Sequence, residues 1–320
     1  MIFISRKRRS NYILTSNPVI SFFFFTLLIY TIYRKHSSNE YPIYRMPKQP
    51  ISKTVTKKQL AVLELLYTFR FGTTDLLART LDLKDGRYIH MRLDALVKQG
   101  YIGKNYDSSY KLKGMSATYY LLPKAFQALK QQSTKSISPR TLRNIYKDKE
   151  ASERFIAHNI AIFTIYGRLH AFYGMNLNLW TKAKLNFEKF DYFPEPKPDA
   201  YLTITPEGVR PRDRSFFLNY LDDETPFFVH VRRLQKYIDY IEANEWADAT
   251  DMKLRGVLLV CESTALLKRI RKKLAQLVDE DEMPRFCYTT LEALKNSTLE
   301  DDEVWQRIGK PLEVFGLRNI

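Results

Sequence analysis

Three stretches of helical periodicity follow one another between residues 54 and 100. The first, TKKQLAVLELLYTFR, carries an apolar stripe made of Leu60, Leu63, Leu66 and Tyr67. Thr56 stands where an N-cap is expected, because a hydroxyl at that position accepts a hydrogen bond from a free backbone N–H. Gly72 ends this helix, and Thr74 is placed to cap a second, short helix in DLLARTLDL. The spacing of these two helices predicts a helix-turn-helix.

A third helix is predicted in KDGRYIHMRLDALVKQGYI, and Gly100 is placed to end it. Its inward face consists of Ile89, Leu93, Leu96 and Val97. Its outward face offers Arg87, Tyr88, His90, Met91, Arg92 and Lys98. The chain then reads as strand, turn and strand, and this hairpin contains Lys104, Lys111 and Lys113. Residues 54–130 therefore predict a winged-helix domain, with the third helix as recognition helix and the hairpin as wing.

A winged helix of this kind suits double-stranded DNA. The recognition helix presents side chains to base edges in the major groove, and lysines of the wing neutralise phosphates. Arg87 and Arg92 are the arginines placed for base or phosphate contacts. The alternative is a docking module for another protein, because one fold serves many functions. Asp85 and Asp94, beside or within the same helix, favour that alternative.

The pattern changes after residue 130. Residues 131–149 are polar, basic and rich in turn formers, which predicts a linker. From residue 150 a long helix is expected that carries His158 and has an apolar side of Phe155, Ile156, Ile160, Phe163 and Tyr166. Strands are expected in LNLWTKAKLNF, KPDAYLTI and SFFLNYLDDE, and helices then alternate with the strands RGVLLVCES and RFCYTTLEAL. Residues 150–320 thus predict an α/β domain with a mixed sheet, and the whole chain a two-domain α/β (α+β) protein.

Composition narrows the class of partner. The chain has 51 Lys+Arg against 35 Asp+Glu, a net charge of +16, which suits a polyanion such as nucleic acid or an anionic membrane. The two cysteines, Cys261 and Cys287, lie far apart, and the five histidines show no ligand spacing. We therefore expect no disulfide framework, no zinc site and a reducing, cytoplasmic environment. No glycine-rich phosphate loop is present, which argues against nucleotide hydrolysis.

Residues 1–45 differ from the rest. No charged residue occurs between positions 10 and 33, and basic residues flank this apolar stretch on both sides. Residues 18–33 are just long enough, with their polar ends, for one membrane span. Two alternatives stay open: an inner-membrane anchor with the other domains in the cytoplasm, or an extension foreign to the native protein, which would then start at Met46. Without residues 1–45 the chain keeps a net charge of +10.

Several short patterns in the second half occur in a known order. A long helix bears His158, a strand starts with PDA at Asp199, an FFL strand follows, and a helix then carries Lys236 and Tyr240 at K-x-x-x-Y spacing. Behind a winged helix, this order resembles the replication-relaxation family of mobile-element proteins over most of residues 54–295. The resemblance implies a restriction-endonuclease-like second domain and an association with plasmid replication and relaxation.

A metal-dependent nuclease needs more than Asp199. Such a site holds Mg²⁺ between carboxylates of adjacent strands and adds a lysine or glutamine two residues beyond the second acid. In the family this second strand typically carries acid-x-acid, whereas here the positions read Asn219, Tyr220 and Leu221. Asp222 and Asp223 lie past the strand, in a predicted turn. We therefore interpret Asp199, Asn219, Lys236 and Tyr240 as the remnant of a site, with Asp222 and Asp223 as weaker candidates.

The sequence predicts a DNA-binding protein of a plasmid or mobile element that acts in replication or relaxation, or in their control. Its nuclease-like domain is expected to be degenerate, to need no cofactor, and to serve for DNA contact or self-association as a homodimer. The first alternative is an active nicking endonuclease that uses Mg²⁺, and the second is a membrane-tethered winged-helix regulator.

Overall fold

The computed structural model describes residues 55–317, except for gaps at 84–85, 107–109, 111–113, 133–143, 186–190, 206–213, 253, 279–285, 299–302 and 308–309. The chain divides into residues 1–52 and a compact unit of residues 53–320. In the described ranges, no helix has the length and apolar character that a membrane crossing requires. The apolar stretch of residues 18–33 lies outside them.

The compact unit starts with the predicted succession of helices. Helix α2 (Lys57–Phe69) has Thr56 as its N-cap, which accepts from the backbone N–H of Gln59 in a capping box. Strand β1 (Phe71–Thr73) follows and was not predicted. The N-cap of helix α3 (Thr74–Thr80) is Thr73, one residue before the predicted Thr74, because the β1 backbone ends there in an extended conformation. Helix α4 (Gly86–Lys98) buries Ile89, Leu93 and Leu96, as predicted.

A small antiparallel sheet completes this part of the chain. Strands β2 (Ile102–Asn105) and β3 (Thr118–Leu121) pair as the predicted hairpin, and β1 adds a third strand on the other side of β3. Helix α6 (Pro123–Gln132) follows. The 3₁₀ helix η1 (Lys147–Glu150) then closes the segment that was predicted to be a linker, and its Asp148 is buried. The end of that segment is therefore part of the folded unit.

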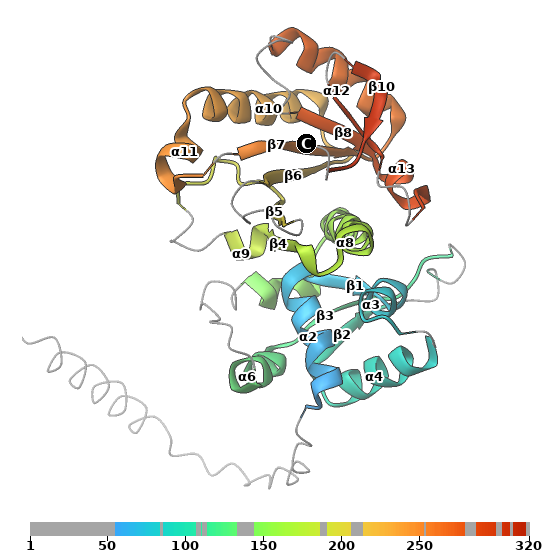
Figure 1. The fold of residues 1–320 in the computed structure, drawn as a ribbon. Coiled ribbons are helices and arrows are strands. Elements are labelled where there is room, and N and C mark those ends of the chain that lie inside the picture. Colours follow the sequence, from blue (N-terminus) through green and yellow to red (C-terminus); the bar gives the residue numbers. More distant parts are fainter. Residues whose placement is uncertain are drawn as a thin grey trace, which may run out of the picture. The chain divides into compact units, whose positions relative to one another are not determined.

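The second half is built on one mixed sheet of seven strands in the order β10-β9-β8-β7-β6-β5-β4 (Figure 1). Helix α8 (Glu153–Tyr173) precedes strands β4 (Leu177–Thr181), β5 (Ala200–Ile204) and β6 (Ser215–Leu221), which pair antiparallel. Helices α10 (Phe227–Glu242) and α11 (Glu245–Thr250) lead to β7 (Leu254–Cys261), and helix α12 (Thr264–Leu277) leads to β8 (Phe286–Thr290). Strands β6, β7 and β8 are parallel, as expected when helices connect them.

The two faces of this sheet belong to two cores, because successive side chains of a strand point to opposite faces. On β6, Phe216, Leu218 and Tyr220 join the core that contains α8 and the apolar faces of α2 and α4. Phe217 and Leu221 join a second core with α10 and α12. Helix α8 therefore lies in one continuous core with the N-terminal helices, and the second half of the chain is fixed to the first.

Several predicted strands end earlier than their sequence pattern suggested. LNLWTKAKLNF is a strand only to Thr181 and continues as the short helix α9 (Lys182–Leu185). RFCYTTLEAL is a strand only to Thr290 and continues as helix α13 (Leu291–Asn296). Thr290 is the N-cap of this helix and accepts from the N–H of Ala293. Strands β9 (Trp305–Arg307) and β10 (Lys310–Phe315) extend the sheet antiparallel beyond the predicted elements.

Candidate functional site

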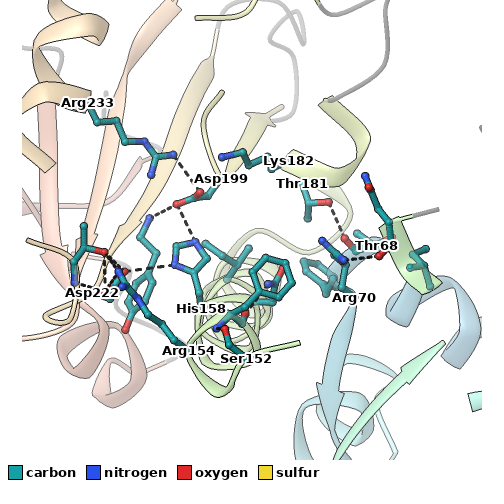
Figure 2. Close-up of a pocket in the computed structure, with 18 of the residues that line it drawn as sticks. Thr68, Arg70, Ser152, Arg154, His158, Thr181, Lys182, Asp199, Asp222 and Arg233 are labelled. Atoms are coloured by element: carbon teal, nitrogen blue, oxygen red, sulfur yellow. Dashed lines mark hydrogen bonds and ion pairs between the residues drawn. The ribbon is translucent and has the colours of Figure 1, made fainter. Parts of the chain in front are cut away.

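A pocket of about 630 Å³ opens where α2, α8, α9 and α10 approach the ends of β4, β5 and β6. The backbone fixes Lys182 beside Asp199 at one wall of this pocket. The N–H of Lys182 donates to the carbonyl of Asp199 over 2.7 Å and continues the β4–β5 ladder. The Thr181 hydroxyl donates to the Thr68 carbonyl at the end of α2. Figure 2 shows Thr68 and Arg70 on one side of the pocket and Asp199 and Arg233 on the other.

Asp199 is the centre of this site. It precedes β5 and is 6% exposed. One carboxylate oxygen, Oδ2, accepts from the Tyr220 backbone N–H at 3.0 Å and lies 3.4 Å from His158 Nε2. The other, Oδ1, accepts from the Arg233 guanidinium at 3.1 Å. Each oxygen thus has a partner, supplied by the strand and by the helices on the two faces of the sheet.

The charges of this cluster stabilise one another. Burial alone would raise the pKa of Asp199, but Arg233, His158 and Lys182 together hold that pKa well below its usual value. Burial likewise opposes the charge of Arg233, yet Asp199 and the Tyr237 hydroxyl raise its pKa above the ordinary value. Asp199 is therefore ionised and Arg233 protonated at neutral pH.

His158 connects Asp199 with Asp222, as Figure 2 shows. Its Nδ1 lies 3.8 Å from Asp222 Oδ2, and its side chain is 26% exposed. The sequence favoured a packed core histidine, but the start of α8 faces the pocket and leaves this ring at its wall. Arg154, one turn earlier, donates to Asp222 at 3.2 Å. Burial tends to raise the pKa of Asp222, and hydrogen bonds from Thr225 and the charge of Arg154 lower it below its ordinary value.

The strand that carries Asn219 and Leu221 supplies no carboxylate. Asn219 is fully buried, and its Oδ1 accepts from the Tyr237 hydroxyl at 3.0 Å. Leu221 is part of the apolar core under α10. Tyr220 points to the opposite face, where its ring lies 5.4 Å from that of His158. Both Asp199 oxygens and the Asn219 oxygen already have protein donors, so this arrangement does not fit Mg²⁺, which needs free oxygen ligands.

Two members of the predicted remnant site lie elsewhere. Lys236 is exposed, and no contact between its side chain and Asp199 occurs among the described residues. Arg233 takes that place instead, because it shares a helical face with Tyr237, to which it also donates. Tyr240 is buried in the core below α10, and its hydroxyl donates to the Tyr192 carbonyl at 2.7 Å. Asp199 is thus satisfied by the Tyr220 backbone N–H and by Arg233, one helical turn before Lys236.

The two acids that follow β6, Asp222 and Asp223, face different surroundings. Asp222 lines the pocket, and its backbone carbonyl lies 2.9 Å from His230 Nε2. Asp223 points away and accepts from the Ser263 hydroxyl at the start of α12. In the described ranges, no group of three or more His, Cys, Asp or Glu side chains is arranged to hold a metal ion.

The predicted DNA-contacting residues lie on α4 and the hairpin. Tyr88 is 59% exposed and Met91 69% exposed. Arg87, His90 and Lys98 are exposed, as is Lys104 on β2, while Arg92 is half-buried. Lys111 and Lys113 lie outside the described residues. The six predicted positions of α4 thus share its outer surface, opposite the buried face.

Four cationic residues of the pocket were not predicted as site residues from the sequence: Arg70, Arg154, Lys182 and Arg233. Arg70 ends α2 with a positive φ of 68° and forms an ion pair with the buried Asp148. Lys182 stands where β4 turns into α9. Only Arg233 could have been predicted from the sequence. It lies four residues before Tyr237, and residues at this spacing share one face of a helix.

Comparisons with known proteins agree with this picture in part. The family model described as replication-relaxation matches residues 63–253. No curated protein matches the chain. Two solved structures of mutants of ZitR from Lactococcus lactis are similar at low level. One has 14% identity and a TM-score of 0.22, covering 42% of this chain and 87% of that chain. The other has 13% identity and a TM-score of 0.21, covering 44% and 89%. TM-scores this low do not establish a common fold.

Proposed function

The chain belongs to the replication-relaxation family, and on that premise we propose that it is a duplex DNA-binding protein of a plasmid or mobile element. It acts in replication or relaxation, or in their control. In this proposal residues 54–130 are a winged helix, with α4 as recognition helix and the β2–β3 hairpin as wing. Residues 150–320 are a nuclease-like domain without catalysis.

The outer face of α4 carries the first part of the proposal. A helix that enters the major groove must be buried on one side and offer long polar, aromatic and cationic side chains on the other. Helix α4 buries Ile89, Leu93 and Leu96, and it exposes Tyr88 and Met91 beside three basic or titratable side chains, Arg87, His90 and Lys98. Large exposed apolar side chains on a basic helix are costly in water and suit a partner surface. A DNA partner explains both features at once.

The environment of Asp199 supports the loss of catalysis. A nuclease carboxylate must be free to bind a divalent cation, whereas Asp199 is paired with Arg233 and His158. The second strand offers an amide that already accepts from Tyr237, followed two residues later by an aliphatic side chain. In the described residues, Asp199 and Asn219 therefore offer no free oxygen to a cation for phosphodiester hydrolysis.

Selection from a random pool of DNA duplexes tests the proposed recognition. We expect the full chain to enrich duplexes that share a sequence, and the double substitution Tyr88→Ala with Met91→Ala to abolish or alter that enrichment. The control is Met175→Ala, because Met175 is 94% exposed and belongs to the 3₁₀ helix that follows α8. If the protein enriches no duplex, or if the double variant selects the same sequence with the same affinity, the proposal is wrong.

A further inference from the structure

The pocket beside Asp199 is large enough for a ligand that the proposed duplex binding does not use. Its volume of about 630 Å³ lies within the range of pockets that bind small organic molecules. Its walls come from α2, α8, α9, α10 and the ends of β4, β5 and β6. Helix α4 does not contribute. A ligand here would therefore be independent of the surface that we propose for duplex DNA.

Three arginines of this pocket are held in place by carboxylates. Arg233 is bound to Asp199, Arg154 to Asp222, and Arg70 to Asp148. Each guanidinium has a further contact as well: Arg233 donates to Tyr237, Arg154 to Thr225 and Arg70 to the Asn144 carbonyl. A guanidinium group has five N–H donors, and within the described residues these contacts and the ion pairs use Nε and Nη2, so the two N–H donors of Nη1 remain for a second acceptor. Ion pairs that fix these side chains also reduce the entropy that a ligand would have to remove. The arginines are thus prepared for an anionic ligand.

Lys182 adds a further positive charge to this pocket. No hydrogen bond or ion pair of its ammonium group occurs within the described part of the chain. Its pKa is lowered, first by loss of hydration and further by repulsion from Arg233, while Asp199 acts in the opposite direction. Asp199 and, to a smaller extent, Glu195 are the carboxylates that act on Lys182, and Asp199 is at the same time paired with Arg233. An anion bound near these two side chains would relieve their repulsion.

The same pocket has an apolar wall. The ring of Phe155 is 37% exposed although it stands on the buried side of the predicted helix pattern, and the Arg70 guanidinium lies 4.7 Å from its centroid. Val229, at the start of α10, is 42% exposed and also lines the pocket. An aromatic ring beside cationic side chains is the combination by which proteins hold a base and its phosphate.

We propose that this pocket binds one phosphorylated nucleotide, free or at the end of a nucleic-acid strand. The phosphate lies between Lys182 and Arg233, and the base lies against Phe155. The proposal needs no metal and no reaction. It goes beyond the proposed function, because the α4 surface can bind duplex DNA whether or not the pocket is filled.

Calorimetric titration of the full chain with four probes tests this assignment. The probes are a deoxynucleoside 5′-monophosphate, the same deoxynucleoside without phosphate, and a trinucleotide with and without a 5′-phosphate. Each phosphorylated probe is compared with its unphosphorylated counterpart, and at least one of them should bind about tenfold more tightly. If only the trinucleotide binds, the ligand is a strand end; if the monophosphate binds equally well, it is a free nucleotide. Both outcomes support the pocket.

Matched variants connect this binding to the pocket. Lys182→Met should weaken the phosphorylated probe about tenfold, because a phosphate contact is lost, and Phe155→Ala should weaken it by removing the stacking surface. Lys236→Met is the control, since Lys236 is exposed on α10 and does not line the pocket. Circular dichroism spectra and thermal unfolding of each variant establish that it is folded.

Four results would overturn the assignment: no phosphorylated probe binds; the phosphate makes no difference to affinity; Lys236→Met weakens binding as much as Lys182→Met; or inorganic phosphate competes as strongly as the nucleotide. Duplex selection by α4 is measured separately. Failure of the pocket proposal would leave that result unchanged, and failure of the duplex proposal would leave the calorimetric result unchanged.

Discussion

Arg233 donates to Asp199 Oδ1 over 3.1 Å, so a guanidinium group neutralises the carboxylate that a metal-dependent nuclease would use for its cation. The same arginine donates to the Tyr237 hydroxyl, which in turn donates to Asn219. The residues at both expected ligand positions are thereby tied into one network with a protein cation. This network explains how Asp199 is stabilised at the end of the sheet although the next strand carries Asn219 and Leu221 in place of acids.

Replacing Arg233 tests the stabilising role of this pair. Arg233→Met leaves the Asp199 carboxylate buried without its guanidinium partner, and loss of one member of a buried pair costs about 3 to 5 kcal/mol. We expect the free energy of unfolding at pH 7 to fall by about 3 kcal/mol. Urea unfolding measures this change. Arg232→Met, an exposed neighbour on the same helix, is the control and should change stability by less than about 0.5 kcal/mol.

The same variant has a pH dependence of known sign. The pKa of Asp199 is depressed in the folded protein, so its contribution to stability is present above the ordinary carboxyl pKa of about 4 and is lost as pH falls through the folded pKa. Arg233→Met should raise the folded pKa of Asp199. The deficit in unfolding free energy should therefore shrink between pH 7 and pH 3. An equal deficit at both pH values would contradict the proposed role of the ion pair.

A plasmid incubated with the protein and Mg²⁺ or Mn²⁺ should stay intact. The reason is that Asn219 and Leu221 stand where the second strand of the family typically carries two acids, and Asp199 is paired with Arg233. Conversion of supercoiled to open-circular plasmid on an agarose gel measures nicking. Nicking that Asp199→Ala abolishes would revive the endonuclease alternative.

The ion pair between Arg70 and Asp148 is predicted to fix the end of α2 to η1. Asp148 is 1% exposed, and burial raises its pKa despite the opposing effect of Arg70. Arg70→Met should destabilise the protein by about 2 kcal/mol or more, because the carboxylate loses its cation. A double-mutant cycle with Asp148→Asn should give a coupling above about 1 kcal/mol.

The exposed pair of Arg79 and Asp75 is the matched control for that cycle. The two side chains are 73% and 61% exposed and lie one helical turn apart. Pairs of this kind contribute about 0.3 to 0.5 kcal/mol. Equal coupling free energies in the two cycles would show that burial does not strengthen the Arg70–Asp148 ion pair.

Helices and strands whose apolar residues recur at a regular spacing could be predicted from the sequence. Helices α2, α4, α8 and α10 and strands β5 and β6 carry apolar residues at their own spacing, and α2 also carries its capping threonine. Strand β1, helix α9 and helix α13 were missed because they contain only three to six residues. Such a segment makes fewer than two helical turns, or little more than one alternation of a strand, so its apolar residues show no period. Their conformations depend on pairing partners and caps.

The candidate site was predicted in part. Asp199 and Asn219 were identified from their strands, and the structure does bring them to one network. Lys236 was chosen over Arg233 because the sequence does not specify which turn of α10 faces the sheet end. The place of Lys182 beside Asp199 depends on the antiparallel register of β4 and β5, which residue patterns alone do not determine.

Salt dependence of duplex binding measures whether basic side chains of α4 and the hairpin contact DNA phosphates. Each phosphate contact made by a lysine or arginine should contribute about 0.9 to the slope of log affinity against log salt concentration. We expect a steep negative slope for the full chain, a slope shallower by about 1.8 for the double substitution Lys98→Ala with Lys104→Ala, and an unchanged slope for Lys295→Ala on α13. Affinity that does not change between low and moderate salt, or an equal slope in all three proteins, would contradict DNA binding through α4 and the hairpin.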